Sequence, residues 1–399
     1  MLLALEGRQV HRLHVGVGEL ERRRGLSGFQ HVSAILCQII FQKTSASAAA
    51  PCDVADALHI IAAVNHKLLG GLAPRAFLAR HWQKRPLFVR RAIAAPALID
   101  ERALMALARR DDVESRIVQR RGRRWSTAHG PFAKTKASKI NWSILVNGVN
   151  HHVAGADELL RRFSFVPQAR LDDVMVSFAT PGGGVGPHVD SYDVFLIQGA
   201  GRRRWRIGKR VFVAGPGDLI YVPPGLEHDG VAIEPCFTYS VGFRAPRGAE
   251  LGAAFLDWLH ERGLPDARYR DPGLRPAANP GRIPAGMLQF ASRFLSRVRW
   301  TRQEVARFLG EYLTQPKPHV VFRAVPSKGA WLRLDAKTQL LYSGDRFFIN
   351  GDSFSLPARD RARMRELADR RGIAAKRLAS QSKLIREWRR AGWLRLEKS

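Results

Sequence analysis

The sequence predicts an α+β fold, in which an antiparallel β-barrel or sandwich precedes a helical region and a winged-helix-like C-terminal domain. Between residues 172 and 244, short β-prone runs alternate with Gly- and Pro-rich turns and no helix intervenes. This spacing is typical of antiparallel sandwiches and barrels. After residue 246 the apolar period becomes helical, and past residue 316 strands and helices follow in winged-helix order.

The length of 399 residues is enough for two or three domains, each with its own core. We divide the chain into four segments. They are an extension expected to be poorly ordered (1–66), a barrel (67–248), a helical region (249–315) and the winged-helix-like domain (316–399).

The barrel is expected to contain five main strands, each bounded by turn residues. A short helix carrying Phe77, Leu78 and Trp82 and a strand at 86–89 precede them. The five strands cover 174–178, 190–197, 203–207, 218–222 and 237–243.

The C-terminal elements follow from periodicity and capping signals. Phe255, Leu256 and Leu259 share one helical face, and Thr301-Arg-Gln-Glu304 is a capping box that opens a second helix. We expect the apolar side chains of that second helix to point inward: Val305, Phe308, Leu309, Tyr312 and Leu313. Beyond it we expect one small sheet (331–334, 340–342 and 347–354, with a hairpin turn at Asn350-Gly351), helices at 359–371 and 383–390, and a last strand holding Trp393 and Leu394.

Composition narrows the classes of function. A hydrophobic content of 45% excludes a wholly disordered chain, and no apolar run is long enough for a membrane helix. No signal peptide is visible, and Cys37, Cys52 and Cys236 are too far apart for a metal or disulfide framework, so we expect a reducing cytoplasm.

The net charge of +30 is unusual and suggests an anionic partner such as nucleic acid. The charge is unevenly distributed. Residues 171–246 hold seven basic and eight acidic side chains, whereas residues 359–399 hold fourteen basic and five acidic ones. The basic excess therefore lies outside the predicted barrel strands, and an Arg-rich surface without a partner remains an alternative.

Three residues form a candidate metal site. His188 and Asp190 are one residue apart, so on a strand both side chains would project from the same face. His228 follows a strand and a tight Pro-Pro-Gly turn that can direct its imidazole toward that pair. Two imidazoles and one carboxylate make the facial triad that suits non-haem Fe(II).

Arg203 is predicted to point inward, because it shares a strand face with Trp205 and Ile207. A buried guanidinium needs an anionic partner, which can be a dicarboxylate cosubstrate or a protein carboxylate such as Asp193 or Glu234. Ser240 could donate a hydrogen bond to the same cosubstrate or only satisfy the sheet.

Several stretches resemble bacterial JmjC-type ribosomal oxygenases, which are 2-oxoglutarate- and Fe(II)-dependent arginine hydroxylases. The resemblance is dense from about residue 68 to residue 246. The stretches are Asp172-Asp-Val-Met-Val-Ser-Phe, Pro181-Gly-Gly-Gly-Val-Gly-Pro-His-Val-Asp, Tyr192-Asp-Val-Phe-Leu-Ile-Gln, Tyr239-Ser-Val-Gly-Phe-Arg-Ala-Pro, His81-Trp-Gln-Lys-Arg-Pro-Leu and Ile140-Asn-Trp-Ser.

The resemblance implies a JmjC/cupin-type double-stranded β-helix barrel and a helical region that forms a homodimer. It also implies Fe(II), with 2-oxoglutarate and O2 as cosubstrates and succinate and CO2 as co-products. The implied substrate is an arginine of the large-subunit ribosomal protein conventionally numbered sixteen. By position, His188, Asp190 and His228 fall on the iron ligands, Arg203 and Ser240 on the 2-oxoglutarate site, and Asp173 and Tyr192 on the site for the substrate side chain.

The chain departs from the family in two places. The stretch 209–214 is shorter than its family counterpart, so we expect a tight hairpin at Gly208-Lys209, and the extension 1–66 has no family equivalent. Two other functions remain open: a cupin-like metalloprotein that does not use 2-oxoglutarate, and a non-catalytic RNA-binding ribosome-assembly factor. For the hydroxylase, the basic periphery could contact ribosomal RNA or an assembling ribosome.

Overall fold

The structure is a computed structural model that describes residues 66–134 and 138–398. The prediction for the extension 1–66 lies outside the described residues except for its last one. Within the described ranges, no helix has the length and apolar character needed to cross a membrane.

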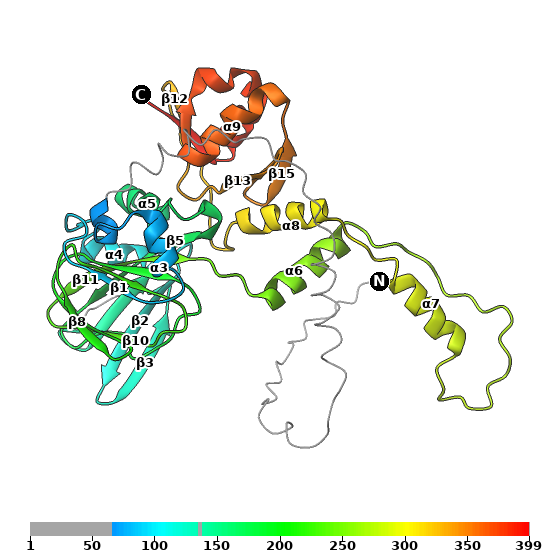
Figure 1. Cartoon of the computed structure of the whole chain (residues 1–399), viewed down its shortest axis with the longest axis horizontal. Helices are drawn as coiled ribbons and strands as arrows, with labels where there is room; N and C mark the ends of the chain where they lie inside the picture. The colour runs from blue at the N-terminus through cyan, green and yellow to red at the C-terminus, as the bar shows by residue number, and fades with distance from the viewer. Residues whose placement is uncertain (1–65, 135–137, 399) are drawn as a thin grey trace, which may run out of the picture. The chain divides into compact units, whose positions relative to one another are not determined.

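The predicted antiparallel barrel is confirmed (Figure 1). An eight-stranded sheet has the order β1-β9-β6-β11-β5-β4-β2-β3, and a three-stranded sheet has the order β10-β7-β8. The strands are β1 (Leu87–Val89), β2 (Ser115–Arg121), β3 (Arg124–His129), β4 (Trp142–Val146), β5 (Leu171–Ala179), β6 (Val194–Gln198), β7 (Arg203–Ile207), β8 (Arg210–Ala214), β9 (Leu219–Val222), β10 (His228–Ala232) and β11 (Cys236–Phe243).

The central strands of the large sheet are buried on both faces, as strand β6 shows, whereas the edge strand β3 is mostly exposed. Phe195 and Ile197 pack in the cluster that includes side chains of helices α3 (Pro74–Arg80), α4 (Glu101–Leu107) and α5 (Ala154–Arg161). Val194 and Leu196 point the other way and pack with Trp205 of the small sheet. Because side chains alternate along a strand, the barrel interior lies between the two sheets and the helices cover the outside.

The hairpin expected at Gly208-Lys209 is present. Ile207 pairs with Arg210, so two residues join β7 to β8. Gly208 has a φ of 53°, which a glycine adopts without steric cost. The short stretch 209–214 therefore closes the small sheet without distorting β7.

The strand expected at 190–197 begins only at Val194. His188 forms an isolated bridge with His228 of the small sheet, whereas Val194 pairs with Val222 of the large sheet. The chain must cross from one sheet to the other between these points. The crossing takes up residues 189–193, which therefore cannot join either ladder.

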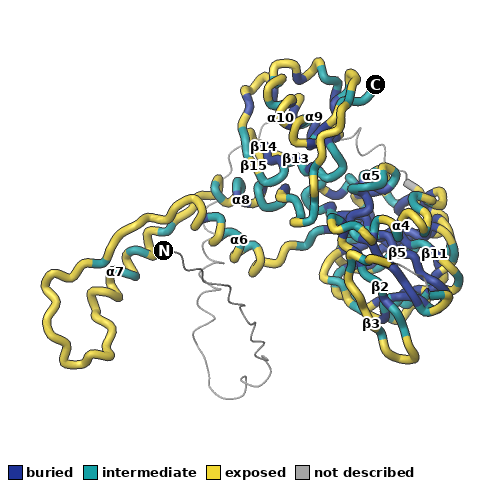
Figure 2. Tube along the Cα trace, turned by 180° about the vertical axis from the view of Figure 1, so that it is seen from behind, coloured by how far each residue is buried: buried dark blue, intermediate teal, exposed yellow. Residues whose placement is uncertain are grey.

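The helical region contains α6 (Gly248–Glu261), α7 (Ala285–Leu295) and α8 (Arg302–Thr314). The predicted capping box of α8 is confirmed, with the Glu304 amide donating to Thr301 Oγ1 at 3.2 Å. The expected inward face of α8 is partly wrong, since Val305 and Leu309 are 39% and 37% exposed, and Leu256 on α6 is 61% exposed. Figure 2 shows that α7 is exposed along most of its length. These apolar side chains lack enough neighbouring protein to cover them.

The C-terminal part has two three-stranded sheets, so the single small sheet we expected is wrong. One has the order β16-β12-β17 and the other β13-β14-β15. The sheet β13-β14-β15 packs on α8, where Phe348 lies against Gly310. Strand β12 instead pairs with β17 near the end of the chain, so it belongs to a different sheet. Asn350-Gly351 is the turn between β14 and β15, as predicted. The elements are β12 (Trp331–Leu334), β13 (Leu340–Ser343), β14 (Arg346–Ile349), β15 (Asp352–Ser355), α9 (Ala358–Arg370), β16 (Gly372–Ala374), α10 (Ser382–Arg390) and β17 (Leu394–Glu397).

Candidate active site

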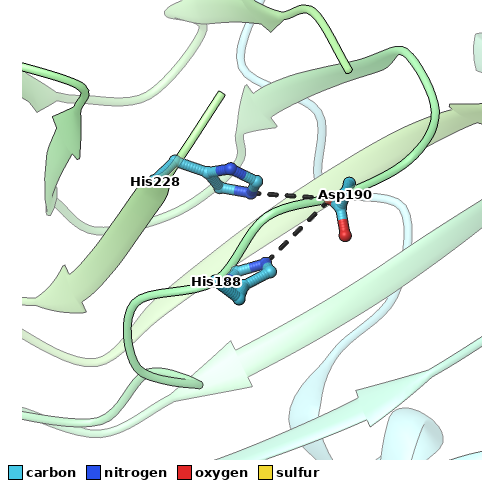
Figure 3. A group of neighbouring side chains, drawn as sticks. All are labelled: His188, Asp190 and His228. Carbon is cyan, nitrogen blue, oxygen red and sulfur yellow. Dashed lines mark ion pairs between the residues drawn. The ribbon is translucent and has the colours of Figure 1, made fainter. Parts of the chain in front are cut away.

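The three predicted metal-binding side chains converge at one point (Figure 3). His228 Nε2 lies 3.5 Å from Asp190 Oδ2, and His188 Nε2 lies 4.0 Å from the same oxygen. The candidate ligand atoms all lie within 4.8 Å of one another. An ion placed between them would contact two imidazoles and one carboxylate, the donor set of the facial triad.

Backbone carbonyls orient both imidazoles. His188 Nδ1 donates to the carbonyl of Gly186 at 2.9 Å, and His228 Nδ1 donates to the carbonyl of Leu226 at 3.1 Å. A proton on Nδ1 leaves the lone pair on Nε2, the atom that faces Asp190. Burial also lowers the pKa of His228, which favours the neutral ring that binds a cation.

Glycines let the loop before His188 lie close to its neighbours. A Cβ on Gly184 would stand 2.4 Å from the carbonyl oxygen of Gly230, and one on Gly183 would stand 2.2 Å from that of Trp142. Only residues without a Cβ fit at such distances, so the Gly-rich stretch is required to bring His188 beside β10.

The metal-binding side chains open into a cavity of about 490 Å³ inside the barrel. This volume is within the range of small-molecule sites. The predicted site residues Arg203, Ser240, Asp173 and Tyr192 all line the cavity. The structure therefore places every residue proposed from the sequence in one pocket.

Arg203 is buried as predicted, with 5% of its surface exposed. Its Nη1 donates to Ser177 Oγ at 3.3 Å, while its Nε and Nη2 have no hydrogen-bond partner. A buried guanidinium with free donors facing a cavity is suited to a carboxylate ligand. This is the feature expected of a site for 2-oxoglutarate.

The protein carboxylates considered as partners for Arg203 are engaged elsewhere. Asp193 accepts from Tyr221 Oη at 2.6 Å and pairs with Arg170 at 3.3 Å. Glu234 pairs with Arg202 at 3.1 Å on the surface. The structural-ion-pair alternative for Arg203 is therefore wrong for both residues that we named.

Sequence reasoning assigned no role to two serines of the cavity wall. Ser177 accepts its hydrogen bond, and Ser143 lines the same cavity with a buried hydroxyl that has no partner. Ser177 could have been found from strand alternation, since it lies four residues after Asp173 on β5. Ser143 stands in the family-like stretch Ile140-Asn-Trp-Ser, but its place on the cavity wall could not be predicted because β4 was not predicted as a strand.

Asp173 is buried on β5, with 8% of its surface exposed. Its Oδ2 accepts from the Gly148 amide at 2.9 Å. Burial raises the pKa of Asp173 to about 6, against the opposing effect of Lys317. Asp173 and Ser177 face the same side of the strand and are separated by about 13 Å, because a strand rises about 3.3 Å per residue.

Lys317 is a further cavity residue that the sequence analysis did not predict. It lies just after α8 and lines the cavity. Its Nζ is 3.1 Å from Asp172 Oδ1 and 3.8 Å from Asp173 Oδ2. No local pattern links residue 317 to residue 173, since only the tertiary fold brings them together.

Two family models match the chain. A JmjC domain matches residues 158–215 and 210–251, and a ROXA-like winged helix matches residues 297–395. The two pieces of the JmjC match overlap at residues 210–215, which include strand β8.

Curated relatives match over much of the chain. The ribosomal protein uL16 3-hydroxylase of Escherichia coli is 35% identical over 323 residues, which cover 71% of this chain and 86% of that protein. A probable ribosomal oxygenase of Haemophilus influenzae is 34% identical over 210 residues, which cover 45% of this chain and 52% of that protein.

Solved structures agree with these relatives. A ribosomal oxygenase from Escherichia coli matches with a TM-score of 0.70 at 32% identity, covering 82% of this chain and 98% of the other. The same protein in complex with cobalt and 2-oxoglutarate also matches with a TM-score of 0.70 at 32% identity, covering 81% of this chain and 98% of the other.

Proposed function

Because the chain belongs to the family of JmjC-domain ribosomal oxygenases, we propose that it hydroxylates an arginine of the large-subunit ribosomal protein uL16. The enzyme is a 2-oxoglutarate-dependent oxygenase that uses Fe(II). One observation carries the proposal for the substrate. The wall of the cavity that holds the metal-binding side chains carries the cation Arg203, whose Nε and Nη2 are unpaired, and the buried carboxylate Asp173, which lies on β5 about 13 Å from the Ser177 that contacts Arg203.

In this proposal, His188, Asp190 and His228 hold the iron through Nε2, Oδ2 and Nε2. Arg203 and Ser240 hold the distal carboxylate of 2-oxoglutarate. The free Nε and Nη2 of Arg203 support this role, because they can form a pair of parallel hydrogen bonds with one carboxylate. With O2, the bound iron and 2-oxoglutarate supply the oxidation that adds one oxygen atom to a C–H bond, giving succinate and CO2 as co-products.

Asp173 and Tyr192 are proposed to hold the substrate side chain. Ionised Asp173 would pair with the guanidinium by a charge-assisted hydrogen bond, and the Tyr192 ring would pack on its plane. Tyr192 is 40% exposed at the cavity, so it can meet an incoming chain. The two residues fix the orientation of the side chain and so select which carbon faces the iron.

Mass analysis of ribosomal proteins tests this function. Cells with the gene should contain uL16 heavier by about 16 Da, the mass of one oxygen atom, than cells lacking it. Cells carrying His188→Ala or Asp190→Ala should match those lacking the gene. An unmodified uL16 in all strains, or modification that survives either substitution, would contradict the proposal.

The two alternative functions lose their support. A cupin-like enzyme without 2-oxoglutarate would need a protein partner for Arg203, but neither Asp193 nor Glu234 contacts it. A non-catalytic factor would have no use for three converging ligands beside a cavity. We also propose a cytoplasmic location, since ribosomal proteins are assembled there.

We propose that the helical region forms a homodimer. Large apolar side chains on α6 and α7 are exposed, which is typical of an interface that another chain covers. They are Leu256 at 61%, Met287 at 43%, Leu288 at 63% and Leu295 at 67%. Isolated surface leucines are ordinary, but three of these four exposed apolar side chains lie on the single helix α7.

We propose that the basic periphery contacts ribosomal RNA, mainly through the β2–β3 hairpin. Arg121, Arg123 and Arg124 are exposed at its turn. Several C-terminal arginines instead pair with carboxylates, as Arg361 does with Asp345 and Arg377 with Glu366. Filter binding over a salt series should show a shallower slope for an R121E/R123E/R124E variant than for K383E/R386E/R390E, which changes three exposed α10 residues.

A further inference from the structure

Lys317 lies at the carboxylate that is proposed to receive the substrate. Its ammonium is 3.1 Å from Asp172 Oδ1 and 3.8 Å from Asp173 Oδ2, and its side chain is 36% exposed. Asp172 also accepts a hydrogen bond from Arg244 Nε at 3.3 Å. Two carboxylates therefore face two cations, and Asp173 already has a cationic neighbour before any substrate arrives.

The backbone around Lys317 holds this side chain in place. Pro316 and Pro318 flank it, and a residue that precedes proline is restricted to extended conformations. The carbonyl of Lys317 accepts from the amide of Val320 at 2.9 Å, which closes a turn. The Lys317 side chain thus reaches the cavity from the start of the segment between α8 and β12, where two prolines restrict the backbone.

The charge of Lys317 is maintained by its neighbours. Burial opposes the charged form, but Asp173 and Asp172 together raise the pKa of Lys317 above its ordinary value. In return, the Lys317 charge lowers the pKa of Asp173, which would be higher if burial acted alone. The two residues therefore keep each other ionised near neutral pH.

We propose that the Lys317 ammonium stays paired with the Asp173 carboxylate until the substrate displaces it. This competition makes the site selective for a cationic side chain. The inference rests on the proposed function, because it assumes that Asp173 binds an arginine. A guanidinium can replace the ammonium, since it offers planar, paired donors to the carboxylate. A neutral side chain cannot compensate Asp173 for the lost charge.

Asp172 allows the substrate guanidinium to replace Lys317 at Asp173 without leaving the Lys317 ammonium unpaired. The Lys317 ammonium is already closer to Asp172 than to Asp173, so it can retain one ion pair when the guanidinium takes Asp173. Lys317 acts through Asp173 and is a positioning residue. The other charged or titratable groups around Asp173 come from several elements: Glu114 before β2, Arg116 on β2, Tyr192 after His188, and Arg244 after β11.

The test uses full-length, metal-free enzyme and two labelled fragments of uL16, followed by fluorescence anisotropy. One fragment carries the arginine that gains oxygen in the mass experiment, and the other carries citrulline there. Lys317→Met should bind the arginine fragment about five-fold more tightly at pH 8.5, because a competing, partly exposed ion pair is gone. Its preference for arginine over citrulline should fall by a similar factor.

The pH dependence separates this role from a structural one. Without Lys317, Asp173 takes up a proton at a higher pH, so the affinity advantage of Lys317→Met should shrink as the pH is lowered from 8.5 to 6.5. Lys317→Arg keeps the cation and should retain the wild-type selectivity and pH profile. Lys328→Met, which removes an exposed lysine outside the cavity, is the matched control and should behave as wild type.

The outcomes distinguish a failure of the Lys317 proposal from a failure of the proposed function. If Lys317→Met keeps the wild-type selectivity and pH profile, whether or not its melting temperature changes, the Lys317 proposal is overturned. In that case the proposed function stands as long as the wild-type enzyme prefers the arginine fragment. If the wild-type enzyme binds both fragments equally, the arginine substrate is itself wrong and both proposals fail.

Discussion

The buried arginine Arg203 has free donors, and its replacement gives a direct measure of cosubstrate binding. Arg203→Leu should raise the KM for 2-oxoglutarate by about 10- to 100-fold, because charge-assisted hydrogen bonds contribute about 1.5–3 kcal/mol. Arg204→Leu changes the exposed neighbour on the same strand and should leave that KM unchanged. Steady-state succinate assays check both variants. An unaltered KM in Arg203→Leu would mean that the cosubstrate is held elsewhere.

A second buried charge, Asp173, should cost the enzyme stability. Its folded-state pKa of about 6 lies above its ordinary value of 3.8, so its contribution to stability is present below pH 4 and is lost as the pH rises through 6. Asp173→Asn should therefore be more stable than wild type at pH 8 by about 1–3 kcal/mol. The gain should vanish near pH 4.

Urea unfolding at both pH values measures this difference. Asp172→Asn is the control, because that neighbouring carboxylate is partly exposed and pairs with Arg244 and Lys317. It should show no gain at pH 8. An Asp173→Asn protein that is less stable than wild type at pH 8 would mean that the ion pair with Lys317 outweighs the cost of burial.

At the scale of elements, close packing between the Gly-rich loop and β10 brings His188 to His228. Gly184→Ala should push the loop away from the Gly230 carbonyl and lower the affinity for a divalent cation by about 5- to 150-fold, because overpacking costs about 1–3 kcal/mol. Gly215→Ala places a methyl group where no atom lies within 4 Å, and it should bind metal normally. Cobalt titration followed by absorption spectroscopy compares them, and equal affinities would contradict this role.

Strand periodicity predicted much of the barrel, because alternation places Arg203 with Trp205 and Ile207 on one face. It was wrong for 190–193, where the pattern continues but the chain crosses between sheets. It also missed β2, β3 and β4, although they supply Ser143 and other residues to the cavity wall. A local pattern indicates which face of a strand is apolar, but it does not indicate which sheet the strand joins.

At the scale of the whole molecule, the exposed apolar side chains of α6 and α7 predict an assembly. Leu288→Asp with Leu295→Asp should convert a dimer to a monomer, because both side chains are more than 60% exposed and would carry charge into the interface. Analytical ultracentrifugation gives the mass. Arg282→Asp combined with Arg297→Asp, which changes polar residues beside α7, is the matched control. A wild-type monomer would refute the dimer.

The sequence by itself determined the fold class and the family, and it predicted the metal-binding residues, since each depends on local order: strand alternation, a His-x-Asp pair and a Pro-Gly turn before His228. Family resemblance also placed Asp173, Tyr192 and Ser240. The tertiary structure decided what these residues contact. It showed that Arg203 has no carboxylate among the two we named, and that Asp173 already faces Lys317. The physical reason is that burial and charge pairing depend on residues distant in the chain, which only folding brings within a few ångströms.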